Sequence, residues 1–388
     1  MNRFHLYLKQ SVGLINRYPS GTPLSHYLKA HFKKNPTLGS RDRKTISALC
    51  YAYFRCSHCF SSNTDFETQL LVSLFLVEQK SQPILEALKP EWKQQITLSF
   101  EEKWKWMEAP ITPLPGFSSF ISSEININDY IQSLYVQPKV FIRIRPSKKR
   151  RIFDQLKEQE ISYQVCDEFA LAFEPGVALD KWNGINRDFV IQDLSSQKVF
   201  HDLLTLPDRA SVWDCCAASG GKSILLHDQC KQNVQLSVSD IRKNMLQNLR
   251  LRLSAAGVPI YHLFAADLTA TSGLSTDTIF DAIICDVPCS GSGTWARTPE
   301  QMYEFDQAKL RMHTIRQRAI LDQVVPHLKP DGQFIYITCS VFAEENELQI
   351  QYLEQKHNLQ CIGMRYHVGF DQRADTLFSA VMKPKIRC

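Results

Sequence analysis

The sequence lacks any uninterrupted apolar run that approaches the roughly 18 residues needed to span a bilayer. It also lacks the apolar core of a secretory signal peptide near its start, and it contains no repeat and no low-complexity segment. Its twelve cysteines are scattered, and Cys285 and Cys339 lie inside apolar, strand-like runs. We therefore expect a cytoplasmic protein with no membrane partner and no disulfide framework.

A second pair of metal ligands is also missing. Cys56-Ser57-His58-Cys59 has the spacing of a ligand pair, but no matching pair follows nearby. Structural zinc sites usually combine two such pairs to reach four ligands. We expect no metal site, with ordinary buried or surface cysteines here, although zinc stays an alternative.

Net charge is not extreme, at +5 with a sequence pI of about 8.5, but its distribution is uneven. The stretch 29–44 holds six basic residues (Lys29, Lys33, Lys34, Arg41, Arg43 and Lys44) and one acidic residue, Asp42. The stretch Arg143 to Arg151 holds six basic residues and no acidic one. Both runs fit contacts with nucleic-acid phosphates, and a solvated protein face is the alternative for each.

A chain of 388 residues is long enough for two or three domains. Apolar residues recur at helical spacing through residues 1–110, which predicts a helical domain. Three prolines and a glycine at 109–116 predict a linker. Residues 120–195 mix strand and helix patterns and predict a small α+β module, while residues 196–388 alternate strands with helices.

The third region predicts an α/β, Rossmann-like sheet. Its expected strands are residues 211–216, 236–240, 260–266, 280–286 and 333–339. Every one of them is expected to deliver polar residues at its carboxyl end, which is the edge where open α/β sheets bind ligands. The expected architecture is therefore a Rossmann-like catalytic domain preceded by the small α+β module and the helical domain.

A glycine-rich turn follows the first strand of this sheet, from Cys216 to Lys222. Such a turn lets backbone approach an anionic or zwitterionic ligand at a helix N-terminus. A Walker A loop would need glycine at Cys216, and a dinucleotide fingerprint starting at Gly291 would need glycine at Ala296. Both are absent, so phosphate-bound nucleotides are disfavoured.

S-adenosylmethionine remains as the expected cofactor. Asp240 ends the second strand and is expected on the ribose hydroxyls, and Asp267 follows the third strand and is expected near the adenine. Each acid taken singly has a helix N-cap as its alternative role.

Two thiols at neighbouring strand ends, Cys289 and Cys339, lie beside Asp286 in this prediction. Carbon 5 of a pyrimidine is a poor nucleophile until a thiolate adds at carbon 6, so this set suits methyl transfer to carbon 5. Asp286 can hydrogen-bond the ring nitrogen, and a thiol near Lys222 ionises more readily. The alternative for either cysteine is a small buried apolar residue.

At this point the chain resembles the RsmB/RsmF-like (Sun family) RNA cytosine-5 methyltransferases. The resemblance is carried by Asp214-Cys215-Cys216-Ala217-Ala218-Ser219-Gly220-Gly221-Lys222, Asp286-Val287-Pro288-Cys289-Ser290-Gly291-Ser292-Gly293, and Thr338-Cys339-Ser340 with Glu344-Glu345-Asn346-Glu347. It covers roughly residues 130 to 382. Gly39 to Arg43 and Tyr51 to Arg55 are similar to the helical domain of RsmB-type members, a NusB-like domain with an RNA-binding role.

The resemblance implies roles for individual residues. Cys339 is implied as the covalent nucleophile, Cys289 as the thiol needed for release, and Asp286 and Lys222 as their catalytic partners. The implied cofactor-binding residues are Cys216, Ala217, Ala218, Ser219, Gly220, Gly221, Lys222, Asp240, Asp267 and Asp286. Ser219 departs from the usual Ala-Pro-Gly-Gly-Lys loop, a change that turn geometry should tolerate.

The resulting expectation is a monomeric, S-adenosylmethionine-dependent RNA cytosine-5 methyltransferase that acts on ribosomal RNA, with transfer RNA as an alternative. No appended RNA-binding domain is expected after the last strand, so the basic N-terminal regions would supply RNA contacts. A non-catalytic RNA-binding or ribosome-assembly factor with the same fold is the alternative from another class. A methyltransferase for DNA or free nucleosides fits the two basic runs less well. The sequence does not name the modified cytosine.

Overall fold

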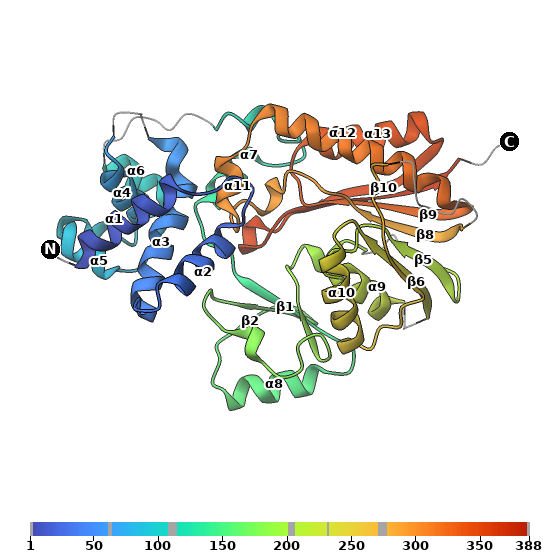
Figure 1. The fold of residues 1–388 in the computed structure, drawn as a ribbon, viewed down its shortest axis with the longest axis horizontal. Coiled ribbons are helices and arrows are strands. Elements are labelled where there is room, and N and C mark those ends of the chain that lie inside the picture. The colour runs from blue at the N-terminus through green and yellow to red at the C-terminus, as the bar shows by residue number, and fades with distance from the viewer. Residues whose placement is uncertain are drawn as a thin grey trace. The chain divides into compact units, whose positions relative to one another are not determined.

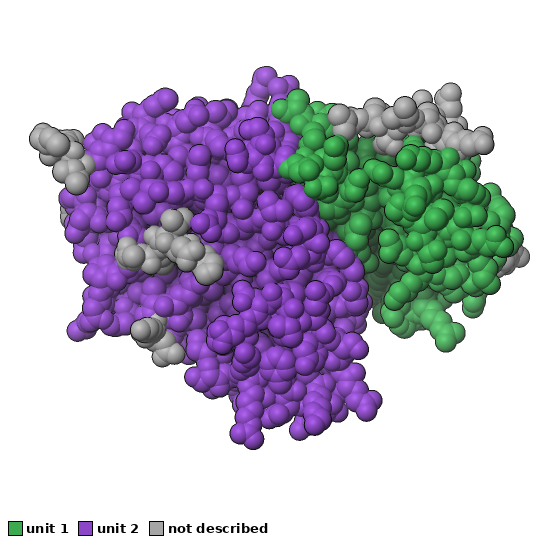
Figure 2. Space-filling view, turned by 180° about the vertical axis from the view of Figure 1, so that it is seen from behind, with its two compact units in different colours: residues 1–119, 126–137, 294–306 green, residues 120–125, 138–293, 307–388 purple. Residues whose placement is uncertain are grey.

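The fold is described from a computed structural model of the chain. The described residues are 3–60, 64–107, 115–200, 206–230, 233–270 and 278–385, so most of the predicted linker at 109–116 lies outside them. The chain divides into two compact units, coloured separately in Figure 2. The first unit comprises residues 1–119, 126–137 and 294–306, and the second comprises residues 120–125, 138–293 and 307–388.

The first unit is helical, as its apolar spacing predicts. Its helices are α1 (Arg3–Asn16), α2 (Leu24–Lys34), α3 (Ser40–Cys56), α4 (Phe66–Val77), α5 (Pro83–Leu88), α6 (Phe100–Trp106), α7 (Ile127–Leu134) and α11 (Pro299–Tyr303). Side-chain caps fix three of the starts: Asp65 accepts a hydrogen bond from the Thr68 amide before α4, Ser99 forms a capping box with Glu102 at α6, and Asn126 caps α7.

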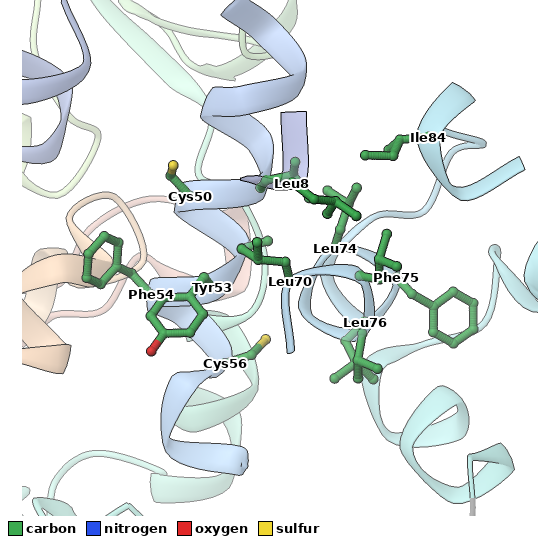
Figure 3. Packing of buried hydrophobic residues seen from close by; sticks show 14 of the residues in the cluster. Leu8, Cys50, Tyr53, Phe54, Cys56, Leu70, Leu74, Phe75, Leu76 and Ile84 are labelled. Atoms are coloured by element: carbon green, nitrogen blue, oxygen red, sulfur yellow. The ribbon is translucent and has the colours of Figure 1, made fainter. Parts of the chain in front are cut away.

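The core of this unit forms where α3 meets α4. Figure 3 shows Tyr53 and Phe54 of α3 near Leu70 and Leu74 of α4, with Leu8 of α1 in the same cluster. All five side chains are buried. Because an apolar helix face must find apolar partners, this cluster accounts for the packing of the helices around α3.

The second unit contains the small module that the mixed pattern predicts. It consists of β1 (Val140–Ile144), α8 (Lys149–Glu158), β2 (Gln164–Asp167), β3 (Ala170–Phe173) and β4 (Phe189–Ile191). The four strands form a sheet of order β2-β3-β1-β4, and every pairing is antiparallel. The strands are short. Buried and exposed side chains alternate along them less regularly than in a sheet with one face open to solvent, because other parts of the unit cover this sheet.

The larger sheet of this unit has seven strands, five of which, β5, β6, β8, β9 and β10, are labelled in Figure 1. They are β5 (Ala210–Asp214), β6 (Val234–Asp240), β7 (His262–Ala265), β8 (Phe280–Asp286), β9 (Leu328–Thr338), β10 (Leu359–His367) and β11 (Leu377–Pro384). Their order in the sheet is β10-β11-β9-β8-β5-β6-β7. The neighbouring strands from β9 to β7 in this order (β9, β8, β5, β6 and β7) are paired in parallel, whereas β11 is antiparallel to both of its neighbours. The predicted Rossmann-like α/β fold is confirmed, with an antiparallel extension.

Helices cover both faces of this sheet. They are α9 (Gly221–Gln229) and α10 (Lys243–Ala255) on one face and α12 (Gln307–Val324) and α13 (Glu347–Lys356) on the other. Because both faces are covered, the central strand β8 is almost wholly apolar, as buried parallel strands are. Within the described ranges, no helix is long and apolar enough to cross a membrane.

Candidate active site at the carboxyl edge of the large sheet

Four parallel strands end side by side at one edge of the large sheet. Asp214 ends β5, Asp240 ends β6, Asp286 ends β8 and Thr338 ends β9, directly before Cys339. The register pairs Asp286 with Ile337, which brings the β8 and β9 ends level. The predicted functional residues therefore share one edge, because the carboxyl ends of neighbouring parallel strands lie at the same side of a sheet.

The turn between β5 and α9 needs unusual backbone. Ala218 has φ 45° and Gly220 has φ 80°, both in the left-handed region. A β-carbon on Gly220 would lie 2.5 Å from the Leu249 side chain, so helix α10 packs directly against the glycine. Ser219 takes none of these strained positions, and its carbonyl and hydroxyl oxygens accept hydrogen bonds from Arg252. The turn therefore tolerates serine there, as expected.

Asp240 ties the end of β6 to this turn. One carboxylate oxygen accepts a hydrogen bond from the Ala218 amide at 3.0 Å, and the other accepts from the amide and Nε of Arg242 at 2.9 Å each. Burial opposes ionisation, but the bonds from Arg242 and Ala218 hold the pKa of Asp240 below its usual range. The carboxylate is charged at neutral pH and faces the cofactor loop.

Sequence reasoning missed Ile241, which follows Asp240 directly. Its side chain is 58% exposed and follows the acid that the sequence predicts on the ribose. An exposed apolar side chain at that position is suited to the flat face of an adenine ring. The signal available from the sequence was a branched apolar residue placed immediately after the acid that ends the second strand.

Asp267 makes different contacts from those of Asp240. It is exposed, and its carboxylate accepts hydrogen bonds from the backbone amide and the hydroxyl of Thr269, which is a turn-capping arrangement. The Thr269 bonds and the charge of Arg316 lower the pKa of Asp267. A contact with adenine therefore stays a prediction, and the capping alternative accounts for every bond that Asp267 makes in the structure.

Asp214 is a fully buried carboxyl at the root of the cofactor loop. One of its oxygens accepts a 2.5 Å hydrogen bond from the Ser223 hydroxyl, whereas the other has no partner among the described protein groups. Burial raises the pKa of Asp214 to about 7. An unpartnered buried oxygen beside a left-handed, glycine-containing turn suits a ligand that carries a cationic amino group, and S-adenosylmethionine has one.

The ammonium of Lys222 lies 2.5 Å from a carboxylate oxygen of Asp286. Burial would lower the pKa of Lys222, but the charge of Asp286 and of the Cys339 sulfur raises it above its usual value. The Lys222 side chain is therefore positively charged at neutral pH, next to the strand ends. The structure brings together Lys222, Asp286 and Cys339, as the sequence predicts.

The Cys289 and Cys339 sulfur atoms lie 3.4 Å apart, and both thiols are free. That separation suits an S–H···S hydrogen bond and is far from the roughly 2.05 Å of a disulfide. The hydrogen bond to Cys339, followed by burial and the charges of Cys339 and Glu345, raises the pKa of Cys289 well above its usual value. The raised pKa favours the thiol form of Cys289, and in the contact between the two sulfurs either one can be the donor.

A buried carboxylate that sequence reasoning did not assign to the site holds the loop after β8. Glu345 accepts hydrogen bonds from the Ser290 amide at 2.8 Å and from the Ser290 hydroxyl at 2.5 Å. Gln317 of α12 donates to the same carboxylate at 3.2 Å and to the Pro288 carbonyl at 3.1 Å. Burial raises the pKa of Glu345. Its place in the Glu344–Glu347 motif was the available signal.

Two predicted phosphate contacts in the basic run at 143–151 are wrong. Arg143 and Arg145 are buried, and each forms a 2.6 Å ion pair with Asp228 of α9. Alternation along β1 turns these side chains towards the large sheet and its helices rather than towards solvent. The later members of the run, Lys148 to Arg151, remain at or near the surface.

No metal centre takes shape at Cys56 to Cys59. In the described ranges, no three potential metal ligands gather at one point. His58 instead lies 2.8 Å from the Tyr135 hydroxyl, and burial lowers the pKa of His58 to about 4. These side chains are part of the packing of the helical unit.

Solved structures share this architecture. PH0851 aligns over 97% of this chain and 96% of its own length, with a TM-score of 0.67 and 16% identity. NSun6 from Pyrococcus horikoshii, solved with SFG, aligns over 71% of this chain and 98% of its own, with a TM-score of 0.58 and 15% identity. At such identities the likeness concerns the fold. The fold is that of the S-adenosylmethionine-dependent methyltransferases.

Sequence comparison narrows this class. Residues 202–376 match the family described as 16S rRNA methyltransferase RsmB/F. The ribosomal RNA small subunit methyltransferase B of Erwinia tasmaniensis is 32% identical over 48% of this chain and 43% of its own length. A probable enzyme of the same name from Bacillus subtilis is 29% identical over 57% of this chain and 50% of its own. Residues 202–376 of the chain are therefore similar to the RsmB/F family, and the chain spans about half the length of these curated relatives.

Proposed function

We propose that this chain methylates carbon 5 of a cytosine in RNA, with ribosomal RNA as the first substrate to test. The observation that carries the proposal is the pair of thiols 3.4 Å apart, beside the Lys222–Asp286 ion pair at the cofactor edge. The names of the matched relatives, which are small-subunit ribosomal RNA methyltransferases, support the choice of substrate.

The cofactor is held, in this proposal, by the chain from Cys216 to Lys222 and by Asp240. The unpartnered Asp214 oxygen and the exposed Ile241 side chain extend this site. When bound, S-adenosylmethionine supplies the methyl group that carbon 5 of the cytosine takes up. Asp267, which caps its own turn, is kept as an adenine contact only as a prediction.

Cys339 is the proposed nucleophile. Its sulfur forms a bond to carbon 6 of the cytosine, and the ring electrons shift to make carbon 5 nucleophilic. The raised pKa of Cys289 supports this assignment, because Cys289 retains its proton while Lys222 supplies positive charge near Cys339. Asp286 is proposed to hydrogen-bond the ring nitrogen of the cytosine.

Release reverses the covalent step. The proton on carbon 5 leaves to a base, the carbon 6–sulfur bond breaks, and its electron pair returns to the Cys339 sulfur. Cys289 is proposed as the thiol needed for this release, since its sulfur lies within hydrogen-bonding distance of the Cys339 sulfur that leaves. The cytosine must be unpaired or flipped, because carbon 6 is inaccessible to a thiol inside a stacked helix.

Three single variants and radiolabelled S-adenosylmethionine test this function. Cys339→Ala should lose methyl transfer to RNA, whereas Cys289→Ala should accumulate an RNA adduct that survives denaturing electrophoresis. Cys361→Ala, on the half-exposed strand β10, serves as the matched control and should behave like the parent. Methylation by Cys339→Ala at the parent rate would overturn the nucleophile assignment, and a Cys289→Ala variant without a shifted band would overturn the release role.

A non-catalytic RNA-binding or assembly factor is the second candidate. The retained cluster of Lys222, Asp286 and both thiols argues against it, since RNA binding alone needs none of them in contact. Calorimetry separates the two: binding of S-adenosylmethionine by the full chain supports the enzyme, and no binding favours the assembly factor.

A further inference from the structure

A groove opens in the helical unit between α2 and α3. Its volume is about 560 Å³, within the range of sites that hold small ligands. The lining residues come from both helices: Ser25, Leu28, Lys29, Phe32, Lys33, Arg43, Ser47 and Tyr51. The groove is therefore lined by three cations of the first basic run and by two aromatic rings.

The charge of the lining is of one sign. Lys29 and Lys33 are exposed and lie one helical turn apart on α2, and Arg43 faces them from α3. Nε of Arg43 donates to the Leu38 carbonyl at 2.8 Å, and its guanidinium lies 6.0 Å from the centre of the Phe32 ring. No carboxylate is among the lining residues, so a bound anion would meet attraction from both walls.

The remaining lining is aromatic and apolar. Leu28 is buried, and Phe32 and Tyr51 are partly exposed to the groove. Burial, with the charge of Glu300, raises the pKa of Tyr51 to about 12, so the phenol stays neutral at physiological pH. A flat, uncharged ring can therefore pack against these uncharged side chains.

We propose that this groove binds one unpaired nucleotide of the RNA substrate, other than the cytosine that is methylated. The base lies against Phe32 and Tyr51, and the flanking phosphates contact Lys29, Lys33 and Arg43. Cations bordering aromatic faces are how proteins hold single-stranded nucleic acid, while an acidic peptide would use the cations alone. The choice of RNA rests on the proposed function.

Charge reversal tests the phosphate contacts. The probe is a fluorescent single-stranded RNA taken from the methylated substrate, and its affinity for the full chain is measured by anisotropy at several salt concentrations. K29E/K33E should weaken binding about tenfold or more and flatten the salt dependence by about 0.7 for each lost phosphate contact. K34E/K44E is the matched control, because it changes charge equally at exposed positions outside the groove. Equal losses in the two variants would overturn the proposal.

Photocrosslinking tests the base contact. RNA carrying 5-iodouridine should crosslink to Phe32 or Tyr51, and peptides mapped by mass spectrometry only to other segments would overturn the assignment. The two proposals can fail separately. If the parent methylates RNA but the groove variants bind RNA as well as their control does, the proposed function stands and the groove proposal fails. If the groove variants lose RNA binding but the parent shows no methylation, the groove proposal stands and the proposed function fails.

Discussion

The Cys289 and Cys339 sulfur atoms meet at 3.4 Å although 50 positions separate the two residues in the chain. The strands before them, β8 and β9, are parallel neighbours, and the Val287 amide donates to the Ile337 carbonyl at 3.1 Å. Beyond the strands, the Gly293 amide donates to the carbonyl of Cys339 at 2.9 Å. Backbone bonds on both sides of the thiols therefore fix their separation.

This proximity predicts reversible inactivation by a mild oxidant. Diamide takes two hydrogens from the thiol pair and is reduced to the hydrazine, while the sulfurs close by about 1.4 Å to disulfide distance. Methyl transfer should fall to background and return with dithiothreitol. Peptide mapping should find Cys289 joined to Cys339, and Cys289→Ala should form no such bond. Loss of activity with both thiols still free would contradict the prediction.

Gly293 is predicted to be irreplaceable for steric reasons. A β-carbon there would lie 1.9 Å from the Thr376 carbonyl oxygen, which belongs to backbone and cannot swing aside. Gly293→Ala should therefore cost about 1–3 kcal/mol of unfolding free energy or more and displace the Cys339 loop. Gly116→Ala is the control, since its β-carbon would meet nothing within 4 Å. Similar denaturation midpoints for the two variants would rule out this steric role.

Glu345 is predicted to position the Cys289 loop rather than to contact the cytosine. Glu345→Ala removes the acceptor of the Ser290 and Gln317 bonds and should lower kcat about tenfold, with little change in S-adenosylmethionine affinity. Glu345→Gln keeps one acceptor oxygen and should recover part of the rate. Glu344→Ala, at the adjacent half-buried position, is the control. A variant that lost cofactor affinity instead of kcat would argue against a positioning role.

Local pattern was enough to predict most of the large sheet and its functional edge. Strands such as β8 are continuous apolar runs ended by proline and glycine, and that signal is complete within a few residues. Because parallel strands share an edge, the predicted neighbours Lys222, Asp286 and Cys339 follow from chain order alone. Strand β10 was missed because its outer position leaves exposed and half-buried residues alternating with a bulge between Cys361 and Gly363.

Long-range partners were not predictable. The charge of Arg143 and Arg145 is readable from the sequence, but their partner Asp228 lies 85 and 83 positions away, on a helix of another substructure. Glu345 likewise reaches Ser290 across 55 positions. A basic run therefore predicts phosphate contacts only where no acid packs against it, and that depends on the tertiary fold.

Asp214 is predicted to make stability depend on pH. Its pKa rises from 3.8 unfolded to about 7 folded, so the folded state binds the extra proton. Its contribution is full below about pH 4 and is lost as the pH rises through about 7. Between pH 4 and 7, the unfolding free energy of Asp214→Asn should therefore increase relative to that of the parent, by up to about 1.4 kcal/mol per pH unit.

Urea unfolding at a series of pH values measures this gain. Asp267→Asn is the control, because the pKa of that exposed carboxylate is lowered and its effect should appear only in acid. A constant difference between Asp214→Asn and the parent across the series would show that Asp214 is ionised throughout.

Asp228 is predicted to be the main electrostatic bond between the small module and the large sheet. Its side chain is buried, and burial opposes its ionisation, but the hydrogen bonds and positive charges of Arg145 and Arg143 hold the pKa of Asp228 far below its usual range. Asp228→Asn leaves two buried guanidinium groups without a carboxylate. The expected cost is about 3–5 kcal/mol of unfolding free energy.

The matched control is Asp154→Asn, which breaks an exposed pair with Arg150 and should cost under about 1 kcal/mol. Because the Asp228 pKa is lowered, its contribution is present above the unfolded pKa and is lost as the pH falls, so parent and variant should converge in acid. The same ion pairs predict that Arg143→Met reduces stability while leaving the salt dependence of RNA binding unchanged. A reduced salt slope for Arg143→Met would place that side chain on the RNA after all.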